Sequence, residues 1–237
     1  MAGYLRCVTP QVTSIPPDPD PDPLAPPGVY APQEDTALLA DALAGEPLPP
    51  DADVLDVGTG SGALALRAAG RGSRVTAVDL SWRAVCTARY NAWRAGLPVR
   101  IRHGDLFAPV RGESFDLIMA NPPYVPGPDS APGPRGPAAS WHGGRDGRAV
   151  LDRICREAPG LLSPGGTLLL VQSALSDADR TLAQLRAAGL EAAVTHRRRI
   201  AFGPVLRARA DWLRERGLLS AAENEEELVV VRAEALC

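Results

Sequence analysis

The chain has 237 residues, enough for one full α/β domain, and its hydrophobic content of 45% fits a folded soluble protein. All 25 basic residues are arginines, which excludes chemistry that needs a lysine, such as a Schiff base or a phosphate-loop lysine. The net charge of -3 argues against broad electrostatic binding to nucleic acid. No apolar run approaches the roughly 18 residues needed to span a membrane, and the N-terminus lacks a hydrophobic signal core. We therefore expect a cytoplasmic protein without a membrane or nucleic-acid partner.

Widely spaced cysteines and histidines give no support for a metal centre or a disulfide framework. No two cysteines form a Cys-x-x-Cys pair, and no pair of histidines lies near one. We expect no bound metal, and we expect each histidine to be a surface or packing residue rather than a catalytic base. The residues concerned are Cys7, Cys86, Cys155, Cys237, His103, His142 and His196.

The first part of the chain differs in composition from the rest. Residues 12–28 are rich in proline and aspartate and cannot form a hydrophobic core. We expect residues 1–27 to be an extended, mobile tail and residues 28–237 to be the folded domain.

The first helix of the domain is expected to end at Gly45, with leucines along one face. Glu34, Asp35 and Thr36 stand at its start, where acids and hydroxyls suit a helix N-terminus. These residues either cap the helix or help to close a ligand site from above.

A glycine-rich turn follows the first predicted strand, residues 53–57. Gly58, Gly60 and Gly62 precede an Ala- and Leu-rich helix, and this order of strand, turn and helix lets a ligand approach backbone amides. The spacing also fits the dinucleotide fingerprint, so the glycines alone leave the ligand undecided. Asp56 favours S-adenosylmethionine, because a carboxylate there would repel a pyrophosphate but suits the ammonium of a methionine, held through water.

Two further acids lie at or just beyond the ends of the next two predicted strands, residues 74–79 and 98–103. Asp79 ends the first of them, where a carboxylate can accept both hydroxyls of a ribose. Asp105 follows the second and can accept from an adenine amine, with Leu106 packing on the ring. The alternative for this site is a turn led by an aspartate.

Between these strands, Ser81 is expected to cap a helix. The apolar face of this helix is predicted to pack in the core rather than to bind a cofactor. This face carries Trp82, Val85, Cys86 and Trp93.

The sequence Asn121-Pro122-Pro123-Tyr124 defines the predicted catalytic corner. It follows an apolar run, residues 115–120, and two prolines can neither continue a helix nor donate to a ladder, so the strand must end there. The side-chain carbonyl of Asn121 and the backbone carbonyl before the Pro122 ring can together hold both hydrogens of a planar NH2 group. Tyr124 supplies a flat face for that group. The alternative is a proline-capped turn with asparagine as turn former.

Two loops beyond the corner are predicted to shape its substrate side. Residues 125–137 have the composition of a linker, and we expect them to form a mobile lid next to the site. Residues 141–148 are expected to fold back over the pocket as a tight, glycine-rich loop. Within that loop, Arg145 and Asp146 can pair with each other.

The remaining chain alternates between strands and helices, which predicts an α/β protein with a doubly wound sheet. The arginine run at 197–199 is expected to be a solvated charged face beside the acidic run at 225–227. The expected strands are 165–172, 190–196 and 225–231. Three helices are expected: one that begins near Val150, one over 176–189 and one over the arginine-rich segment 202–219.

Taken together, Asp56-x-Gly58-x-Gly60-x-Gly62, Asp79, Asp105 and Asn121-Pro122-Pro123-Tyr124 resemble the class I methyltransferases. More narrowly, residues 28–200 are similar to the HemK/PrmC family of protein glutamine methyltransferases. The segments 29–36 (Val-Tyr-Ala-Pro-Gln-Glu-Asp-Thr), 141–148 and 161–164 (Leu-Leu-Ser-Pro) resemble its short archaeal and eukaryotic branch, which lacks the N-terminal helical domain. The resemblance implies a Rossmann-like, mostly parallel seven-stranded sheet with an antiparallel last strand.

The resemblance also implies roles for individual residues. Asn121 and Pro122, with Pro123 and Tyr124, would orient a glutamine amide of a protein substrate for in-line attack on a methyl sulfonium. A small zinc-binding activating subunit is the partner that the short branch implies. S-adenosyl-L-methionine would be bound by Thr36, Asp56, Gly58, Gly60, Gly62, Asp79, Asp105, Leu106 and Asn121.

Two other functions are compatible with these motifs. A methyltransferase could act on another planar amine, such as adenine in nucleic acid or a small metabolite, because the corner would serve it equally well. The acidic net charge and the lack of a target-recognition domain count against a nucleic-acid substrate. The second alternative is a nucleotide-binding regulatory module that has the fold but does not catalyse a reaction.

Overall fold

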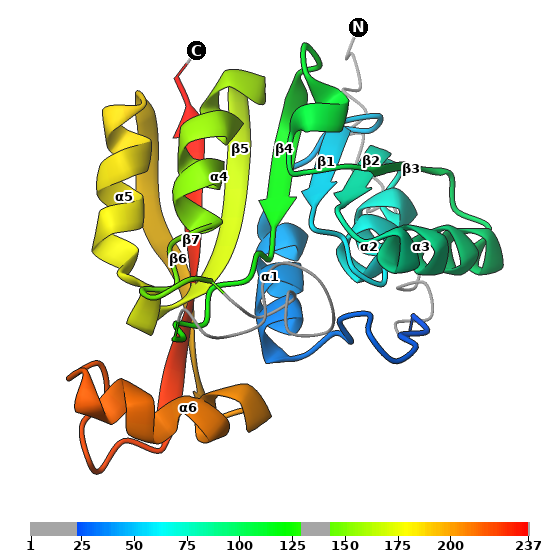
Figure 1. Cartoon of the computed structure of the whole chain (residues 1–237). Helices are drawn as coiled ribbons and strands as arrows, with labels where there is room; N and C mark the ends of the chain where they lie inside the picture. Colours follow the sequence, from blue (N-terminus) through cyan, green and yellow to red (C-terminus); the bar gives the residue numbers. More distant parts are fainter. Residues whose placement is uncertain (1–22, 129–142, 237) are drawn as a thin grey trace, which may run out of the picture.

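A computed structural model describes residues 23–128 and 143–236 of the chain. Its centre is a seven-stranded sheet in the order β3-β2-β1-β4-β5-β7-β6 (Figure 1). The strands are β1 (Asp53–Val57), β2 (Arg74–Asp79), β3 (Val99–His103), β4 (Phe115–Ala120), β5 (Leu162–Ser173), β6 (Leu190–Ala201) and β7 (Glu225–Ala235).

The last strand, β7, runs antiparallel to both of its neighbours, β5 and β6, and every other neighbouring pair is parallel. The expected mostly parallel sheet with an antiparallel last strand is therefore confirmed. The strand order reverses between β1 and β4, where Val57 lies opposite Ala120. In open α/β sheets, ligands bind at such a reversal, beyond the carboxyl ends of the strands.

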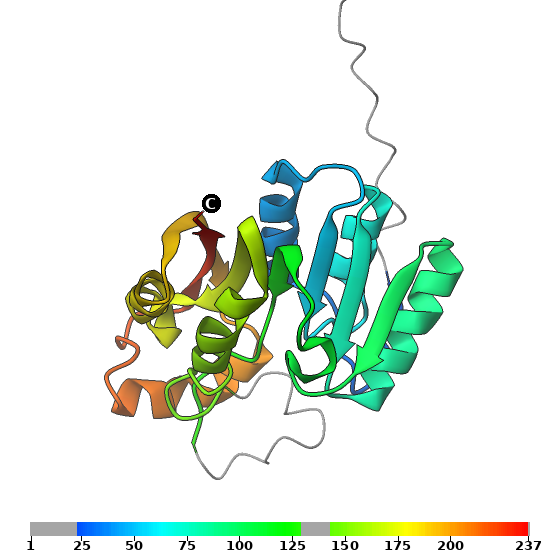
Figure 2. The ribbon, with the colours of Figure 1, turned by 90° about the horizontal axis from the view of Figure 1, so that it is seen from above.

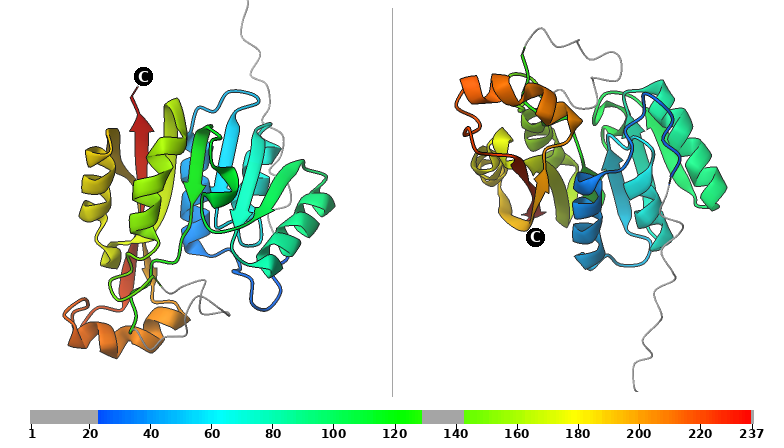
Figure 3. Two further views of the ribbon diagram at one scale, coloured as in Figure 1. Left: turned by 45° about the horizontal axis from the view of Figure 1, so that its top comes forward. Right: turned by 90° about the horizontal axis from the view of Figure 1, so that it is seen from below.

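Helices cover both faces of the sheet (Figure 2). α1, α2 and α3 lie on one face, α4 and α5 lie on the other, and α6 lies beyond the carboxyl edge of the sheet (Figure 3). The helices are α1 (Glu34–Gly45), α2 (Ala63–Gly70), α3 (Trp82–Ala95), α4 (Leu151–Glu157), α5 (Ala178–Ala187) and α6 (Pro204–Glu215).

The central strands are buried on both faces, as their continuous apolar sequences predict. In β4, the run from Leu117 to Ala120 is fully buried, and in β5 the run from Leu168 to Val171 is equally buried. Such close-packed strands form a stiff platform. The loops at their carboxyl ends are held on that platform.

Strand β6 continues to Ala201, beyond its predicted end at residue 196. The arginine run belongs to this strand: Arg199 lies opposite Glu227 of β7, and Ala201 lies opposite Glu225. Arg197 also makes an ion pair of 2.7 Å with Glu227. Opposite charges on adjacent strands favour pairing, so the basic and acidic runs extend the two strands together.

The predicted core face of α3 is largely wrong. Val85 is buried, but Cys86 is exposed, and the exposed fractions of Trp82 and Trp93 are 60% and 76%. The buried side of the helix instead carries Ala84, Ala88 and Ala92, and Ala88 packs closely against the start of α2, where only small side chains fit. A Cβ on Gly62 would lie 3.3 Å from the Cβ of Ala88.

Residues 23–27, the end of the expected tail, lie against α3. The Leu24 amide donates to Asn91 Oδ1 at 3.1 Å, and Asn91 Nδ2 donates to the Leu24 carbonyl at 2.9 Å. Arg83 donates to the Pro27 carbonyl at 2.6 Å. Residues 1–22 lie outside the described residues, so the domain boundary at residue 28 stays a prediction.

Across residues 23–128 and 143–236, no helix combines the length and apolar character needed to cross a bilayer. The cytoplasmic location expected from the sequence stays a prediction.

Candidate active site

The carboxyl ends of β1, β2 and β4 bring the glycine turn, Asp79 and Asn121 to one edge of the sheet. β1 lies between the other two strands, so its loop is flanked by both of their ends. A Cβ on Gly58 would lie 3.9 Å from the backbone oxygen of Asn121. The predicted glycine turn and the predicted corner therefore face each other across the crevice.

The glycine turn is bonded to the end of β2. The amides of Gly58 and Thr59 donate to the Val78 carbonyl at 2.8 and 3.0 Å, and the Gly60 amide donates to Asp79 Oδ2 at 2.9 Å. Gly58 and Gly60 have φ angles of 75° and 56°, a region that residues with a Cβ rarely adopt. The turn thus needs glycine for its backbone conformation.

Asp56 lies buried beneath this turn, with an exposed fraction of 1%. Its Oδ2 accepts from Thr59 Oγ1 at 2.6 Å and from the Ala65 amide at 3.1 Å, whereas its Oδ1 is buried without a hydrogen-bond partner. Burial raises the pKa of Asp56 to about 6. An unpaired carboxylate oxygen at this point suits an ammonium group or a water that binds one, so the residues fit the methionine end of S-adenosylmethionine.

Asp79 is half-buried at the end of β2, and burial raises the pKa of its carboxyl group. Its two oxygens accept from the amides of Gly60 at 2.9 Å and Ser81 at 2.8 Å. These bonds hold the carboxylate in one orientation. Each oxygen still has a free lone pair that can accept from a ribose hydroxyl.

Asp105 takes a different position from the other predicted acids. It is exposed, and its two oxygens accept from both terminal nitrogens of Arg153 at 3.0 and 2.9 Å. Leu106, next in the chain, is half-buried and has a φ angle of 46°. The Asp105 carboxylate is thus turned toward α4, and its contact with an adenine amine stays a prediction.

The side-chain amide of Asn121 is oriented by α1. Its Nδ2 donates to Thr36 Oγ1 at 3.3 Å, which leaves Oδ1 as the acceptor on this residue. Thr36 was predicted to cap the helix or to help close the site. The N-cap residue is Gln33, without a side-chain capping bond, so the contact of Thr36 with the corner supports the second alternative.

Asp35 connects the start of α1 to Tyr124. Its Oδ2 accepts from the hydroxyls of Tyr30 at 2.6 Å and Tyr124 at 3.0 Å, and its Oδ1 accepts from the Thr36 amide at 2.6 Å. Burial and the charge of Asp35 raise the pKa values of both tyrosines. Both phenols therefore keep their protons and act as donors. Tyr124 is 8% exposed and is anchored by its bond to Asp35. Its role as a flat face for the substrate stays a prediction.

Glu226, at the start of β7, is a buried acid that the sequence did not point to. It is 7% exposed, and its Oε2 has no hydrogen-bond partner. Burial raises the pKa of Glu226 to about 7, and the charge of Asp35 adds to this rise, while a hydrogen bond with Ser173 opposes it. In the sequence it stands in an acidic run, Glu225 to Glu227, and only the strand pairing shows which member points inward.

The loop after residue 142 pairs with the chain that leaves the corner. The Gly143 amide donates to the Val125 carbonyl at 3.1 Å, and the Gly127 amide donates to the Gly144 carbonyl at 3.0 Å. A Cβ on Gly147 would lie 2.3 Å from the Tyr124 carbonyl oxygen, so that position requires glycine. Residues 143–148 of the predicted loop thus fold back toward the corner, and their place over a substrate pocket stays a prediction. Residues 129–142, with most of the predicted lid, lie outside the described residues.

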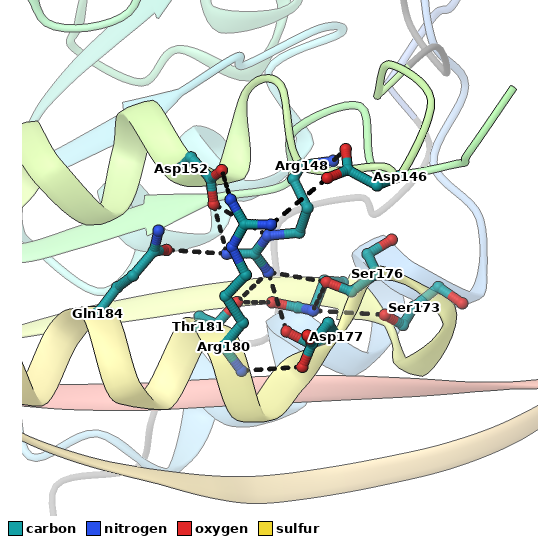
Figure 4. Close-up of polar contacts among 10 residues, drawn as sticks. Asp146, Arg148, Asp152, Ser173, Ser176, Asp177, Arg180, Thr181 and Gln184 are labelled. Carbon is teal, nitrogen blue, oxygen red and sulfur yellow. Dashed lines mark hydrogen bonds and ion pairs between the residues drawn. The ribbon is translucent and has the colours of Figure 1, made fainter. Parts of the chain in front are cut away.

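Arg148 fastens this loop between α4 and α5 (Figure 4). Its side chain is 2% exposed and donates to Asp152, Thr181 and Gln184 and to two backbone carbonyls at the start of α5. The Asp152 contact is an ion pair of 2.8 Å. Asp146 accepts from the Arg148 amide at 3.0 Å and contacts Arg180 at 3.4 Å, and its pairing with Arg145 stays a prediction.

Comparison with known proteins agrees with this geometry. The family model of the methyltransferase small domain matches residues 24–132. The chain is 33% identical over 177 residues to a putative protein N5-glutamine methyltransferase, MJ0928, of Methanocaldococcus jannaschii, covering 74% of this chain and 88% of that protein. It is 44% identical over 147 residues to the release factor glutamine methyltransferase of Deinococcus radiodurans, covering 60% of this chain and 52% of the relative. The chain thus spans about half the length of that bacterial relative.

Among solved structures, the Mtq2–Trm112 complex of E. cuniculi is similar, with a TM-score of 0.63 and 26% sequence identity. The match covers 87% of this chain and 98% of that one, and the complex is described as responsible for methylation of the eRF1 translation termination factor. Fold and site together define an S-adenosylmethionine-dependent methyltransferase. More narrowly, the chain belongs to the HemK family of protein glutamine methyltransferases. The resemblance expected from the motifs is therefore confirmed.

Proposed function

We propose that this protein transfers the methyl group of S-adenosylmethionine to the side-chain amide nitrogen of a glutamine in a protein substrate. The observation that carries this proposal is the orientation of Asn121. Because its Nδ2 is engaged by Thr36, its Oδ1 is left to accept a hydrogen from the incoming amide. The family membership of the chain supports glutamine as the acceptor.

For the methyl donor, each group of the crevice has a separate task. The unpaired oxygen of Asp56 would hold the ammonium, directly or through water, and Asp79 would accept from the ribose hydroxyls. Gly58 and Gly60 would let the donor approach the backbone of the turn, Gly62 would hold the turn by its close packing on Ala88, and Thr36, Asp105 and Leu106 would line the remaining surface. Bound S-adenosylmethionine supplies a methyl group on a sulfonium, which is already a strong electrophile.

For the acceptor, the corner works by orientation. Asn121 Oδ1 and the backbone carbonyl before the Pro122 ring would each accept one hydrogen of the planar NH2 group. Pro122 and Pro123 keep the backbone rigid, and Tyr124 is fixed by its bond to Asp35. Holding the nitrogen in line with the methyl group is the main catalytic effect available from these residues, and none of them needs to act as a base before transfer.

We further propose that the chain works with a small zinc-binding activating subunit. The similar E. cuniculi structure is a complex of two proteins, Mtq2 and Trm112. In addition, α3 exposes apolar rings of Trp82, Tyr90 and Trp93, which a partner could cover. Purifying the chain with and without affinity-tagged candidate partners tests this point. A stable and fully active monomer purified alone would count against the subunit.

The proposed reaction is tested by incubating the protein with a cell extract and tritium-labelled S-adenosylmethionine. We expect the label in protein, on a glutamine whose mass rises by one CH2 unit in tandem mass spectrometry, because a methyl group replaces a hydrogen that leaves as a proton. Label in nucleic acid or in small metabolites would replace the glutamine proposal by methylation of another planar amine. Binding of NAD instead of S-adenosylmethionine in isothermal titration calorimetry would remove the methyl donor from the proposal.

A further inference from the structure

Helix α6 lies at the same edge of the sheet as the Asn-Pro-Pro-Tyr corner. Strands β5 and β6 run in the same direction, because both pair antiparallel with β7, so the chain leaves β6 at the carboxyl edge. There it forms α6, beyond the ends of the strands (Figures 1 and 3). Phe202, Leu206 and Leu213 are buried and attach this segment to the core. The arginine-rich segment is thus a fixed part of the site's surroundings.

One guanidinium of α6 reaches the chain that leaves the corner. Arg209 Nη1 donates to the carbonyls of Val125 at 3.1 Å and Pro126 at 2.9 Å. These two residues directly follow Tyr124. The segment from Pro122 to Pro128 contains four prolines, which have no N–H to donate, so few backbone bonds can hold it. A side chain that donates to its carbonyls supplies the missing restraint.

Within the described residues, Arg209 has carbonyl partners but no acidic one. The side chain is half-buried, no ion pair with it is found within the described residues, and burial lowers its pKa. Other arginines of the helix make local contacts: Arg214 pairs with Asp211 at 3.2 Å, and Arg207 Nε donates to the Phe202 carbonyl at 2.6 Å. Withdrawing a cation from water with carbonyl partners alone costs free energy. The contacts of Arg209 therefore do not serve to stabilise α6. They restrain the segment that follows the corner.

We propose that Arg209 is a positioning residue that fixes the backbone of Val125 and Pro126 and thereby the direction in which the corner presents the acceptor amide. This inference rests on the function proposed above. Other contacts also hold this segment: the Gly143 amide donates to the Val125 carbonyl at 3.1 Å, the Gly127 amide donates to the Gly144 carbonyl at 3.0 Å, and Ser176 Oγ donates to the Tyr124 carbonyl at 2.5 Å. Arg209 is the residue of α6 that adds a restraint, because it donates to the Val125 and Pro126 carbonyls from the side of that helix. Without Arg209, the acceptor nitrogen is in line with the methyl group for a smaller fraction of the time.

Three variants of the full chain test the proposal. Arg209→Met removes the donors and keeps the length of the stem, Arg209→Lys restores one donor group, and Arg207→Met removes an equal charge from the same helix. Hydrogen exchange followed by mass spectrometry reports on the peptide 121–128, in which only the non-proline amides contribute. We expect the Gly127 amide, which donates to the Gly144 carbonyl, to exchange at least about tenfold faster in Arg209→Met, at the wild-type rate in Arg207→Met, and in between in Arg209→Lys.

Methyl transfer is measured on the same variants with tritium-labelled S-adenosylmethionine and the extract protein that the wild type labels. We expect kcat to fall about 10- to 100-fold in Arg209→Met, as for a displaced reacting group, with partial rescue in Arg209→Lys. The dissociation constant of S-adenosylmethionine should change less than twofold. Unchanged exchange in Arg209→Met, or equal effects in Arg207→Met, would overturn the inference. The exchange result needs no acceptor, so it stands apart from a failure of the proposed reaction.

Discussion

The acids around the site differ in how many of their carboxylate oxygens have a hydrogen-bond partner. Asp35 has both oxygens engaged, by Tyr30, Tyr124 and Thr36. Asp56 and Glu226 each keep one buried oxygen without a partner. A buried acceptor without a donor is unfavourable in the empty protein and favourable for a ligand that brings a donor. These two side chains are therefore where pH is expected to act on binding and on stability.

Exchanging Asn121 for alanine should abolish methyl transfer while the affinity for S-adenosylmethionine changes only a few-fold. The substitution removes the acceptor oxygen at the corner but leaves the glycine turn, Asp56 and Asp79 intact. Transfer is measured with tritiated donor, and affinity is measured by isothermal titration calorimetry. Asn224→Ala, at an exposed site, is the matched control. Retained turnover in the Asn121 variant would refute its assigned role.

The affinity for S-adenosylmethionine should increase as the pH rises from 5 to 7. The pKa of Asp56 is about 6, so its carboxyl group becomes charged, and able to hold an ammonium, across this window. In Asp56→Asn we expect about tenfold weaker binding at pH 8 and loss of most of this pH dependence, since a charge-assisted bond is lost. Titrations at several pH values give both quantities. The exposed Asp51→Asn serves as control, and an unchanged pH profile in Asp56→Asn would contradict the assignment.

Glu226→Gln should stabilise the protein at high pH. The pKa of Glu226 rises from 4.5 to about 7 on folding, so the folded chain binds the proton more tightly. The contribution of Glu226 to the free energy of unfolding is fully present below pH 4.5, where its carboxyl group is protonated in both states. As the pH rises through 7, the free energy of unfolding falls by about 3 kcal/mol in total. We therefore expect Tm of the variant to exceed that of the wild type by about 5 to 10 °C at pH 8 and to match it near pH 4.

Scanning calorimetry at these two pH values checks the prediction, with the exposed Glu225→Gln as control. A variant of Glu226 that is less stable than the wild type at pH 8 would show that its carboxylate is paired in solution.

At the level of elements, α4 and α5 are joined by a buried polar cluster rather than by apolar contacts alone (Figure 4). Arg148 satisfies side chains and carbonyls from both helices and also ends the loop that pairs with the corner. The contacts of Arg148 therefore connect the packing of α4 against α5 with the position of the loop that pairs with the corner.

Arg148→Met should destabilise the protein by about 3 to 5 kcal/mol, because Asp152, Thr181 and Gln184 would lose a buried charged donor. Urea denaturation followed by circular dichroism measures the change. Arg156→Met, on the exposed side of α4, should lie within about 0.5 kcal/mol of the wild type. Equal stability of the two variants would mean that the cluster is open to water.

The sequence predicted the elements that have a strong local signal and missed what depends on distant pairing. The strand, glycine turn and helix around Gly58 and the strand end at Asn121 follow from local residue chemistry, and both are observed. The exposure of Trp82 and Trp93 could not be foreseen, because periodicity shows an apolar face but not whether anything covers it. The contacts of Asp35 with two tyrosines join residues 30, 35 and 124, and no local pattern announces them.

At the scale of the whole molecule, the start of the described chain is part of the fold. Asn91 is 1% exposed, and both ends of its amide bond to Leu24. Residues 24 and 27 therefore contact the folded domain although they precede the expected boundary at 28.

A chain that begins at Pro23 should match the full chain in stability, whereas a chain that begins at Gly28 should lose about 1 to 3 kcal/mol. The shorter chain leaves the buried Asn91 amide without its Leu24 partners. Thermal unfolding of the three proteins measures the difference. If the two truncated chains unfold at the same temperature, the contact with α3 is not formed in solution.

Arg198 of β6 makes ion pairs of 2.8 Å with Glu34 and Asp41 of α1, so the first helix contacts a strand that is synthesised about 150 residues later. Residues 30–36, which orient the corner, belong to that helix and the turn before it. A nascent chain that has emerged only as far as Tyr124 would hold the complete glycine turn and the corner, but α1 would lack its contacts with β6. Translation should therefore yield a competent enzyme only after β6 has left the ribosome, and fragments that stop before β6 should be inert toward substrate.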